Sequence, residues 1–286
     1  MKNWKRTAAL VLAIGMMGSL LAGCGGAASE EKAANRLEDI IQRGYIEVAT
    51  EPAFAPNEFI DPSKPDNEKY VGSDIELAKY IADALGVELR IVPLEFSAVL
   101  AGVTEGKYDL AISALAYKPD RAEAMTLSKG YYFSTENAGH TLLIREEDKD
   151  TIKSPEDMSG KTVVVQSGSL QELFVTEQMP KDVEIKRVSS TTDGFLMVQE
   201  GKADACPTSV TTAELYIQAN KGCGLMLLDD FRFALTPEMD GTRIGMPKGE
   251  PELEAKINEL IDEVVESGIY AQWYDEYSDY AASLGL

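Results

Sequence analysis

One short stretch of the chain, Glu105-Gly106-Lys107-Tyr108-Asp109-Leu110-Ala111, recurs 95 positions later as Glu200-Gly201-Lys202-Ala203-Asp204-Ala205-Cys206. In each copy a segment of helical period ends near the glycine, and an apolar run of strand length begins after it. Chance similarity of two such turns is the alternative interpretation. The shared phase of the preceding helices favours a repeated supersecondary unit, so the chain is predicted to contain two similar α/β halves.

Outward from these two copies, apolar runs of strand length alternate with segments of helical period, which is typical of an α/β layer architecture. In the first half we expect strands at 46–50, 87–93 and 108–113, and helices at 74–85 and 97–105. In the second half we expect strands at 161–166, 183–188, 203–206 and 225–228, and helices at 169–178, 192–200 and 210–219. A strand at 242–246 and two helices at 251–266 and 270–280 are predicted to close the chain.

Composition excludes several classes of protein. The 286 residues are 44% hydrophobic and 26% charged, as in an ordinary globular protein. Asp and Glu number 48 against 27 Lys and Arg, and the resulting net charge of −21 argues against a nucleic-acid partner. Three cysteines and one histidine leave little from which to build a metal site or a histidine-dependent catalytic centre, so no metal and no cofactor are expected.

The N-terminus resembles a bacterial export signal. Lys2, Lys5 and Arg6 precede an apolar run over 7–21 that ends in Leu-Ala-Gly-Cys at Cys24. An uncleaved membrane anchor is the alternative, but the run is shorter than a spanning helix requires and contains two glycines. The ending is similar to a lipoprotein box, in which the cysteine is acylated and becomes the mature N-terminus. We therefore expect a lipoprotein signal peptide at 1–23, lipidation of Cys24, and a flexible tether at 24–34.

Four further stretches of the sequence matter together: 50–59, 71–79, 109–113 with 119–121, and 160–169 with Glu172. In this order they resemble the extracellular solute-binding proteins, family 3, of polar amino-acid ABC transporters. Ser73, within the second stretch, stands where a bulky apolar residue is usual in the family.

The resemblance implies an α/β, two-lobe, periplasmic-binding-protein-like (type II) fold with the ligand cleft between the lobes and two hinge strands. Lobe 1 would comprise 35–136 and 243–286, and lobe 2 would comprise 139–240. Such a fold encloses its ligand by hinge closure. Ligands of open α/β sheets lie at the carboxyl ends of strands, where the candidate loops are also expected.

The resemblance also implies a ligand site. Arg121 would fork the oxygens of a carboxylate, although a solvated surface arginine is the alternative. Ser169 could cap its helix, bind an anion with the free amides there, or do both. Phe54 and Phe96 would stack on the apolar part of the ligand, or belong to the core. The implied ligand-binding set is Glu51, Phe54, Phe96, Ser113, Ala114, Ala116, Arg121, Ser169, Leu170, Gln171 and Ser209.

Three positions depart from the family pattern. Ser209 replaces the acidic residue that pairs with the ligand's α-ammonium, and Ala114 and Ala116 replace usual small or hydroxyl-bearing residues. Glu51 is then the only acidic candidate that the motif match supplies. The pocket is expected to prefer a cationic or amide-bearing amino acid, or to hold a ligand that is not a standard α-amino acid.

These observations predict a binding protein rather than an enzyme. The expected function is the substrate-binding component of an amino-acid ABC importer, acting as a monomer on the outer face of the cell membrane with permease subunits as partners. A secreted dehydratase-like enzyme of the same fold is the main alternative. Its acid or base would be Glu51 or another loop carboxylate, because the lone histidine, His140, falls at the predicted hinge. A ligand-sensing receptor domain, which should continue into a membrane span, is the third class.

Overall fold

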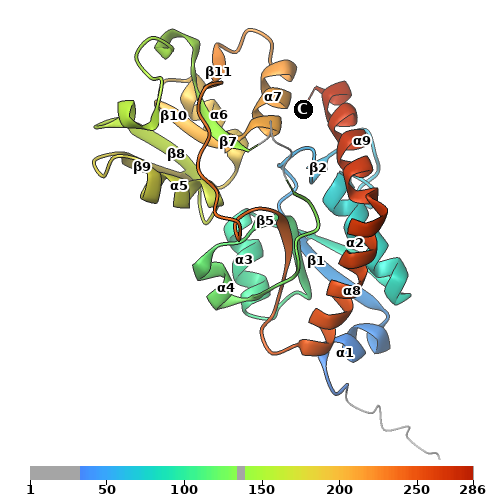
Figure 1. Ribbon diagram of the computed structural model, residues 1–286. Coiled ribbons are helices and arrows are strands. Elements are labelled where there is room, and N and C mark those ends of the chain that lie inside the picture. Colours follow the sequence, from blue (N-terminus) through green and yellow to red (C-terminus); the bar gives the residue numbers. More distant parts are fainter. Residues whose placement is uncertain (1–32, 134–138, 286) are drawn as a thin grey trace, which may run out of the picture. The chain divides into compact units, whose positions relative to one another are not determined.

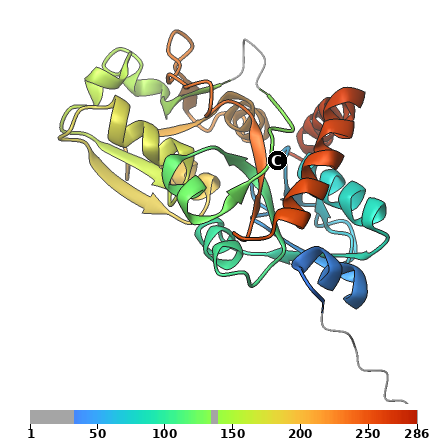
Figure 2. The ribbon, with the colours of Figure 1, turned by 60° about the horizontal axis from the view of Figure 1, so that its bottom comes forward.

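The computed structural model describes residues 33–133 and 139–285, which form two lobes, each built on a five-stranded sheet (Figures 1 and 2). The expected signal peptide, the lipidated Cys24, most of the expected tether and the first expected hinge crossing lie outside the described residues. None of the helices in the described residues is long and apolar enough to cross a lipid bilayer.

The sheet of the first lobe contains strands from both parts of the chain. Its order is β4-β1-β5-β12-β6, with β4 and β5 parallel to β1, and β12 antiparallel to both β5 and β6. Because β12 comes from the last quarter of the chain, the chain leaves this sheet and returns to it. The strands are β1 (Tyr45–Thr50), β4 (Glu88–Pro93), β5 (Leu110–Ala116), β6 (Thr126–Leu127) and β12 (Thr242–Met246).

Both faces of this first sheet are covered, as a largely parallel sheet requires. Val48 belongs to a core cluster that contains residues of four helices, and Ala49 belongs to a second cluster with a fifth helix, so successive residues of β1 point to opposite faces. The four helices are α1 (Arg36–Arg43), α2 (Ser73–Leu85), α8 (Pro251–Ser267) and α9 (Ile269–Leu284), and the fifth is α3 (Phe96–Thr104). In Figure 1, α8 and α9 run beside α2.

The second sheet has the order β11-β7-β10-β8-β9. Helix α5 packs on one face, and helices α6 and α7 pack on the other. The strands are β7 (His140–Arg145), β8 (Thr162–Gln166), β9 (Glu184–Val188), β10 (Ala205–Ser209) and β11 (Leu225–Leu227). The helices are α5 (Leu170–Gln178), α6 (Thr191–Gln199) and α7 (Val210–Ala219).

Most predicted elements are present with ends shifted by only a few residues, and the exceptions have local causes. The strand predicted to end at Cys206 continues to Ser209 as β10, through Pro207. The register of β10 with β8 contains only Ala205, so Pro207 pairs with β7 alone and interrupts no second ladder. The sequence analysis did not predict β7, α1, or the two-residue strands β6, β2 (Phe59–Ile60) and β3 (Tyr70–Val71), and of the short α4 (Pro119–Ala124) it indicated only the start.

The repeated sequence forms a repeated structure. In both copies the helix ends two residues before the glycine, and Gly106 and Gly201 adopt φ of +71° and +69°, where a side chain would be strained. Asp109 N–H donates to the carbonyl oxygen of Glu47 at 3.1 Å, and the Glu47 N–H donates back to Asp109 Oδ2 at 2.8 Å. Asp204 exchanges the same two bonds with Thr162, each at 2.8 Å.

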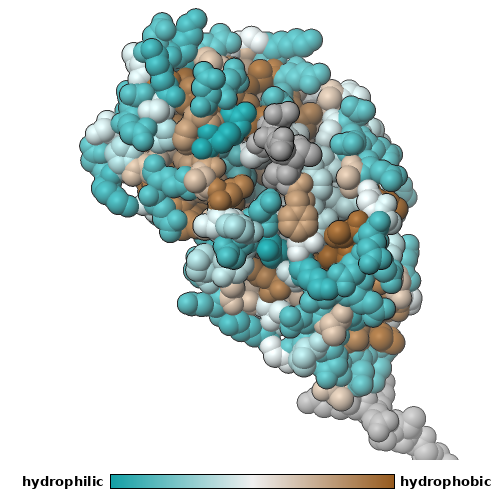
Figure 3. Space-filling model, in the orientation of Figure 1, coloured by the Kyte–Doolittle hydropathy of each residue, from teal (hydrophilic) through white to brown (hydrophobic). Residues whose placement is uncertain are grey.

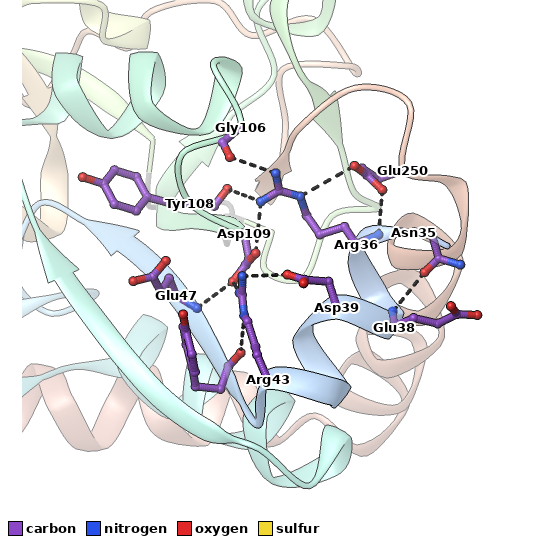
Figure 4. Close-up of polar contacts among 11 residues, drawn as sticks. Asn35, Arg36, Glu38, Asp39, Arg43, Glu47, Gly106, Tyr108, Asp109 and Glu250 are labelled. Atoms are coloured by element: carbon purple, nitrogen blue, oxygen red, sulfur yellow. Dashed lines mark hydrogen bonds and ion pairs between the residues drawn. The ribbon is translucent and has the colours of Figure 1, made fainter. Parts of the chain in front are cut away.

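Asp109 also binds two arginines of the first helix, α1 (Figure 4). Its side chain is 1% exposed; Arg36 Nη1 lies 3.0 Å from Oδ1, and Arg43 Nη2 contacts Oδ2. Arg36 additionally donates to the carbonyl oxygen of Gly106 at 2.8 Å. One buried carboxylate therefore joins the first helix, the first strand and the turn before β5.

The visible surface of the described residues is mainly hydrophilic, with apolar side chains in small separate groups (Figure 3). The large apolar side chains that are exposed are spread over four elements and one loop: Ile41, Ile60, Leu196 and Val265 on α1, β2, α6 and α8, and Phe133 outside any element. Scattered apolar side chains of this kind need no partner surface to cover them.

We expect Asp109→Asn to lower the free energy of unfolding by about 2–4 kcal/mol, because it leaves two arginines without their buried anion. Asp39→Asn is the matched control: its side chain is 53% exposed and pairs with Arg43 at 3.0 Å, so the loss should stay below about 1 kcal/mol. Urea unfolding at pH 7 measures both. Equal losses would contradict the assignment of Asp109 as the structural link.

Candidate functional site

A cavity lies where the two lobes meet, and its wall contains every residue of the predicted ligand set. Residues from both lobes contribute, and most follow the carboxyl ends of strands, where α/β sheets place their ligands. The structure brings together Glu51, Phe54, Phe96, Ser113, Ala114, Ala116, Arg121, Ser169, Leu170, Gln171 and Ser209. The structure adds residues that the sequence analysis did not select, among them Asn57, Glu58, Tyr132, His140, Gln166, Thr211, Asp240 and Tyr274.

Arg121 supplies a buried positive charge to this wall. Its side chain begins in the first turn of α4, and the residue is 5% exposed. Nη1 donates to the carbonyl oxygen of Ala116 at 2.5 Å, Nη2 donates to that of Gly168 at 3.0 Å, and Nε has no hydrogen-bond partner among the described residues. No carboxylate of the described residues lies within ion-pair distance, and burial lowers the pKa of Arg121 to about 10. The guanidinium therefore lacks an anion.

Glu51 supplies the opposite charge. It follows β1, is 5% exposed, and receives a hydrogen bond on Oε2 from Gln166 Nε2 at 3.3 Å. Burial raises the pKa of Glu51 from 4.5 to about 8, and the neighbouring acids Asp193 and Glu95 add to this shift. Within the described residues, no lysine or arginine pairs with Glu51. This carboxyl group is therefore short of a cation, as Arg121 is short of an anion.

Glu51 is not the only acidic residue of the cavity, which corrects the sequence analysis. Asp240 also lines it, and so does Glu58, which is 1% exposed and accepts a hydrogen bond from Ser113 Oγ at 2.8 Å. Glu58 lies within the first quoted loop motif, but spacing alone gave no sign that its side chain turns inward. Burial and the adjacent Asp74 raise its pKa well above the usual range of a glutamate.

Ala114 connects the cavity wall to a buried acid beneath it. It has φ of +47°, a left-handed conformation that costs a non-glycine residue about 1–2 kcal/mol. Its amide N–H donates to Asp74 Oδ2 at 2.7 Å. Asp74 Oδ1 accepts from Tyr131 at 2.9 Å and from Tyr270 at 2.5 Å. These bonds hold the end of β5 in its strained conformation at the site.

The start of α5 forms another part of the wall, with a correction to the predicted role of Ser169. Ser169 caps the helix by accepting from the amide of Glu172 at 3.2 Å, as predicted. However, the amide of Ser169 donates to the carbonyl oxygen of Gln166 at 3.2 Å, so it is already engaged. The first amides of the helix itself, those of Leu170 and Gln171, have no acceptor within a helix by position. They are the better candidates for an anion site.

The lone histidine contributes no charge at neutral pH. His140 begins β7 and lines the cavity, and burial lowers its pKa to about 4. Its Nδ1 lies 3.1 Å from Nε2 of Gln171. Within residues 33–133 and 139–285, no cluster of His, Cys, Asp or Glu side chains is arranged to hold a metal ion.

Comparison with known proteins identifies the class. The sequence pattern of the bacterial extracellular solute-binding proteins, family 3, matches residues 46–280, and the chain belongs to this family. The arginine-binding extracellular protein ArtP of Bacillus subtilis (strain 168) is 28% identical over 210 residues, which cover 71% of this chain and 76% of ArtP. The family comprises extracytoplasmic, amino-acid-binding components of ABC transporters.

Solved structures agree in fold. The amino acid ABC transporter substrate-binding protein AbpA from Streptococcus pneumoniae Canada MDR_19A, bound to L-arginine, has a TM-score of 0.75 and 30% identity, covering 86% of this chain and 98% of AbpA. The ancestral amino acid-binding protein AncCDT-1, a precursor of cyclohexadienyl dehydratase, has a TM-score of 0.72 and 28% identity, covering 85% and 99%. The two-lobe fold expected from the sequence is thus confirmed.

The raised pKa of Glu51 predicts a pH-dependent stability of the ligand-free protein. Unfolded Glu51 ionises near pH 4.5, whereas the folded protein keeps its proton up to about pH 8. Its contribution to the free energy of unfolding is therefore complete below about pH 4.5 and is lost as the pH rises through 8. At about 1.4 kcal/mol per pKa unit, wild type should lose about 3 kcal/mol more than Glu51→Gln between pH 5 and 8. Denaturant unfolding at both pH values measures this difference; parallel curves would contradict the assigned pKa.

Proposed function

We propose that the protein is the substrate-binding subunit of an ABC importer for a cationic or amide-bearing amino acid, with arginine as the first candidate. One observation carries this proposal: the same cavity contains a buried guanidinium without an anion and a buried carboxyl group without a cation. A ligand that is negative at one end and positive or strongly polar at the other completes both. ArtP is named as an arginine-binding protein and AbpA has L-arginine bound, and both facts support arginine in particular.

The ligand's carboxylate would bind Arg121 and the first amides of α5. A guanidinium is suited to a carboxylate in a poorly hydrated site, because its planar fork can donate to both oxygens. The cationic or amide end would bind Glu51. Phe54 and Phe96 line the same cavity and would flank the aliphatic stem; the ring centroid of Phe96 lies 5.6 Å from the Arg121 guanidinium carbon.

The α-ammonium group is the part of the ligand with the fewest partners. Ser209, where the family has an acid, uses its hydroxyl to accept from the amide of Thr212 at 3.2 Å and so caps α7. Ala114 and Ala116 offer no hydroxyl. A small carboxylate without an α-ammonium, or a non-standard amino acid, therefore stays as an alternative ligand.

We also propose the location and partners given by the N-terminal pattern and the family. The mature protein would be attached through a lipid on Cys24 to the outer face of the cell membrane, would act as a monomer, and would deliver its ligand to permease subunits. The scattered exposure of large apolar side chains supports a monomer, because a stable dimer usually buries a contiguous apolar patch.

A dehydratase-like enzyme is the second candidate, and one observation favours it. The raised pKa keeps Glu51 protonated at pH 7, which is the state required of a general acid. AncCDT-1 is also described as a precursor of a dehydratase. Incubation with a prephenate-like substrate tests this candidate: turnover that disappears in Glu51→Gln would replace the binding function with an enzymatic one.

A calorimetric panel of amino acids tests the ligand class. We expect binding of arginine, lysine, histidine or glutamine, and rejection of glutamate by Glu51 and by the acidic surface. Glu51→Gln should weaken binding of the cationic ligand at least tenfold, equivalent to about 1.4 kcal/mol. Tight binding of glutamate, or of a carboxylate with no amine, would contradict the assignment.

Arg121→Ala tests the carboxylate subsite in a thermal-shift assay. The variant should fold but lose the ligand-induced rise in melting temperature, because truncating one partner of a buried charge pair costs about 2–5 kcal/mol. Lys129→Ala, which removes an exposed cation that pairs with Asp262, should shift like wild type. A normal shift in Arg121→Ala would remove this residue from the site.

Metabolic labelling with a fatty acid tests the anchor. Wild-type protein should incorporate the label, and Cys24→Ala should not incorporate it and should be released into the medium. Wild-type protein that keeps Met1 and takes up no label would show that the lipoprotein assignment is wrong.

A further inference from the structure

We infer that Glu58 is a second carboxylate of the subsite for the ligand's cationic group, and that this group displaces a proton that Glu58 shares with Asp74. The inference rests on the proposed function, because it requires a cationic ligand. It adds a specificity-determining residue that is separate from Glu51.

Glu58 is built into the wall of the cavity and held there by its backbone. Its amide donates to the carbonyl oxygen of Phe54 at 3.1 Å, and its own carbonyl oxygen accepts from the Phe54 amide at 2.8 Å. Oε1 accepts from Ser113 Oγ. Oε2 is fully buried and has no hydrogen-bond donor among the described residues. A buried carboxylate oxygen without a donor is costly, so this atom must either hold a proton or await a ligand.

Asp74 is the neighbour that decides where the proton lies. Its two oxygens receive three hydrogen bonds, from Tyr131, Tyr270 and the amide of Ala114. Burial raises the pKa of Asp74, and these three donors oppose that shift because they favour the ionised form. Glu58 receives a single donor, so the proton belongs on Glu58, whose free oxygen can donate it toward Asp74. In agreement, the largest causes of the raised pKa of Glu58 are burial and the charge of Asp74.

The remaining ionisable groups around the cluster add no positive charge. Glu51 faces Glu58, and Asp193 and Glu95 raise the pKa of Glu51 in turn. His140 is neutral at pH 7. Arg121 donates to carbonyl oxygens, and Asp120, which lies outside the cluster, acts on its pKa. No lysine or arginine of the described residues forms an ion pair with the cluster of Glu51, Glu58 and Asp74.

A polar network below the cluster fixes its geometry, and Ser73 belongs to it. The hydroxyl of Tyr270, on α9, accepts from Asn57 Nδ2 at 3.0 Å and lies 3.0 Å from Ser73 Oγ. These contacts keep the Tyr270 hydroxyl directed at Asp74. The serine at a position that is usually bulky and apolar therefore has a physical role: it helps hold Asp74 ionised and leaves the proton on Glu58.

Binding then involves a balanced exchange of charge. When the ammonium or guanidinium of the ligand enters, the O–H bond of Glu58 breaks, its proton passes to solvent, and the resulting carboxylate pairs with the ligand. Glu51 loses its proton in the same way. A cationic ligand should therefore release about two protons at pH 7, and an uncharged analogue of the same shape should release none.

Calorimetry with L-arginine at pH 7, in phosphate and in Tris, measures this release, because the two buffers take up protons with different heats. Wild type should release about two protons. Glu58→Gln keeps an acceptor for Ser113 and should release one fewer, with binding weakened about tenfold or more. Glu105→Gln is the control: it removes an exposed carboxylate that pairs with Lys107, outside the cavity wall, and should release as many protons as wild type. Citrulline, the uncharged analogue of arginine, should release none.

The possible outcomes separate the two proposals. Arginine binding with the same affinity and proton release in Glu58→Gln as in wild type would overturn the role of Glu58 and leave the proposed function intact. Binding of glutamine but of no cationic amino acid to wild type would overturn the role of Glu58 alone, and absence of binding of all four amino acids of the panel (arginine, lysine, histidine and glutamine) would overturn both. If Glu58→Gln does not fold, the wild-type affinity alone decides: between pH 7 and pH 6 it should fall about a hundredfold for two displaced protons, and about tenfold for Glu51 alone.

Discussion

Burial of charge without a counter-ion is the constraint on which this site depends. Arg121 and Glu51 are each 5% exposed, yet one donates only to neutral carbonyl groups and the other receives only one amide hydrogen bond. Removing either ion from water costs several kcal/mol, and neutral hydrogen bonds return only part of that cost. As a consequence, the pKa of Glu51 is raised and the pKa of Arg121 is lowered, and each shift favours the neutral form of the group. In the proposed function, a ligand with charge at both ends would supply the two missing counter-charges.

Helix α2 contributes both to the core of the first lobe and to the shape of the cavity. Asp74 lies in the first turn of α2, whose residues Leu77 and Ile81 pack against the first sheet. Its carboxylate binds the end of β5 through Ala114 and the C-terminal helix through Tyr270. Three elements distant in sequence are thereby fixed to one buried oxygen pair, so the positions of the site residues follow from the packing of the lobe.

Local patterns predicted most of the architecture because helices and strands repeat with fixed periods and end at recognisable residues. They missed β7, which begins at the predicted hinge, and α1, which is held by tertiary ion pairs with Asp109 rather than by a wide apolar face. They also ended β10 too early, because a proline ends a strand where a ladder needs the missing N–H, and the register of β10 with β8 stops before Pro207.

The site contains features that sequence patterns could not predict. Family resemblance selected eleven residues that meet at one cavity, but it undercounted the acids, since a residue's spacing along a loop does not reveal where its side chain points. Glu58 and Asp240 are examples. It also could not show that the Ser169 amide is already bonded within its own turn.

The contacts between the lobes indicate how the charge of a ligand would affect the free energy of lobe closure. Arg121 donates to Gly168 at 3.0 Å, Gln166 donates to Glu51 at 3.3 Å, and Leu215 of α7 packs into an apolar cluster of the first lobe. Each hydrogen bond of this kind contributes only about 1 kcal/mol net. In the proposed function, closing the lobes without a ligand would bury the unpaired Arg121 guanidinium and keep Glu51 from ionising, at a cost that such bonds do not offset. A ligand that supplies both counter-charges would remove this cost, whereas an uncharged molecule of equal size would leave it in place, so the proposed discrimination would arise in the closing step itself.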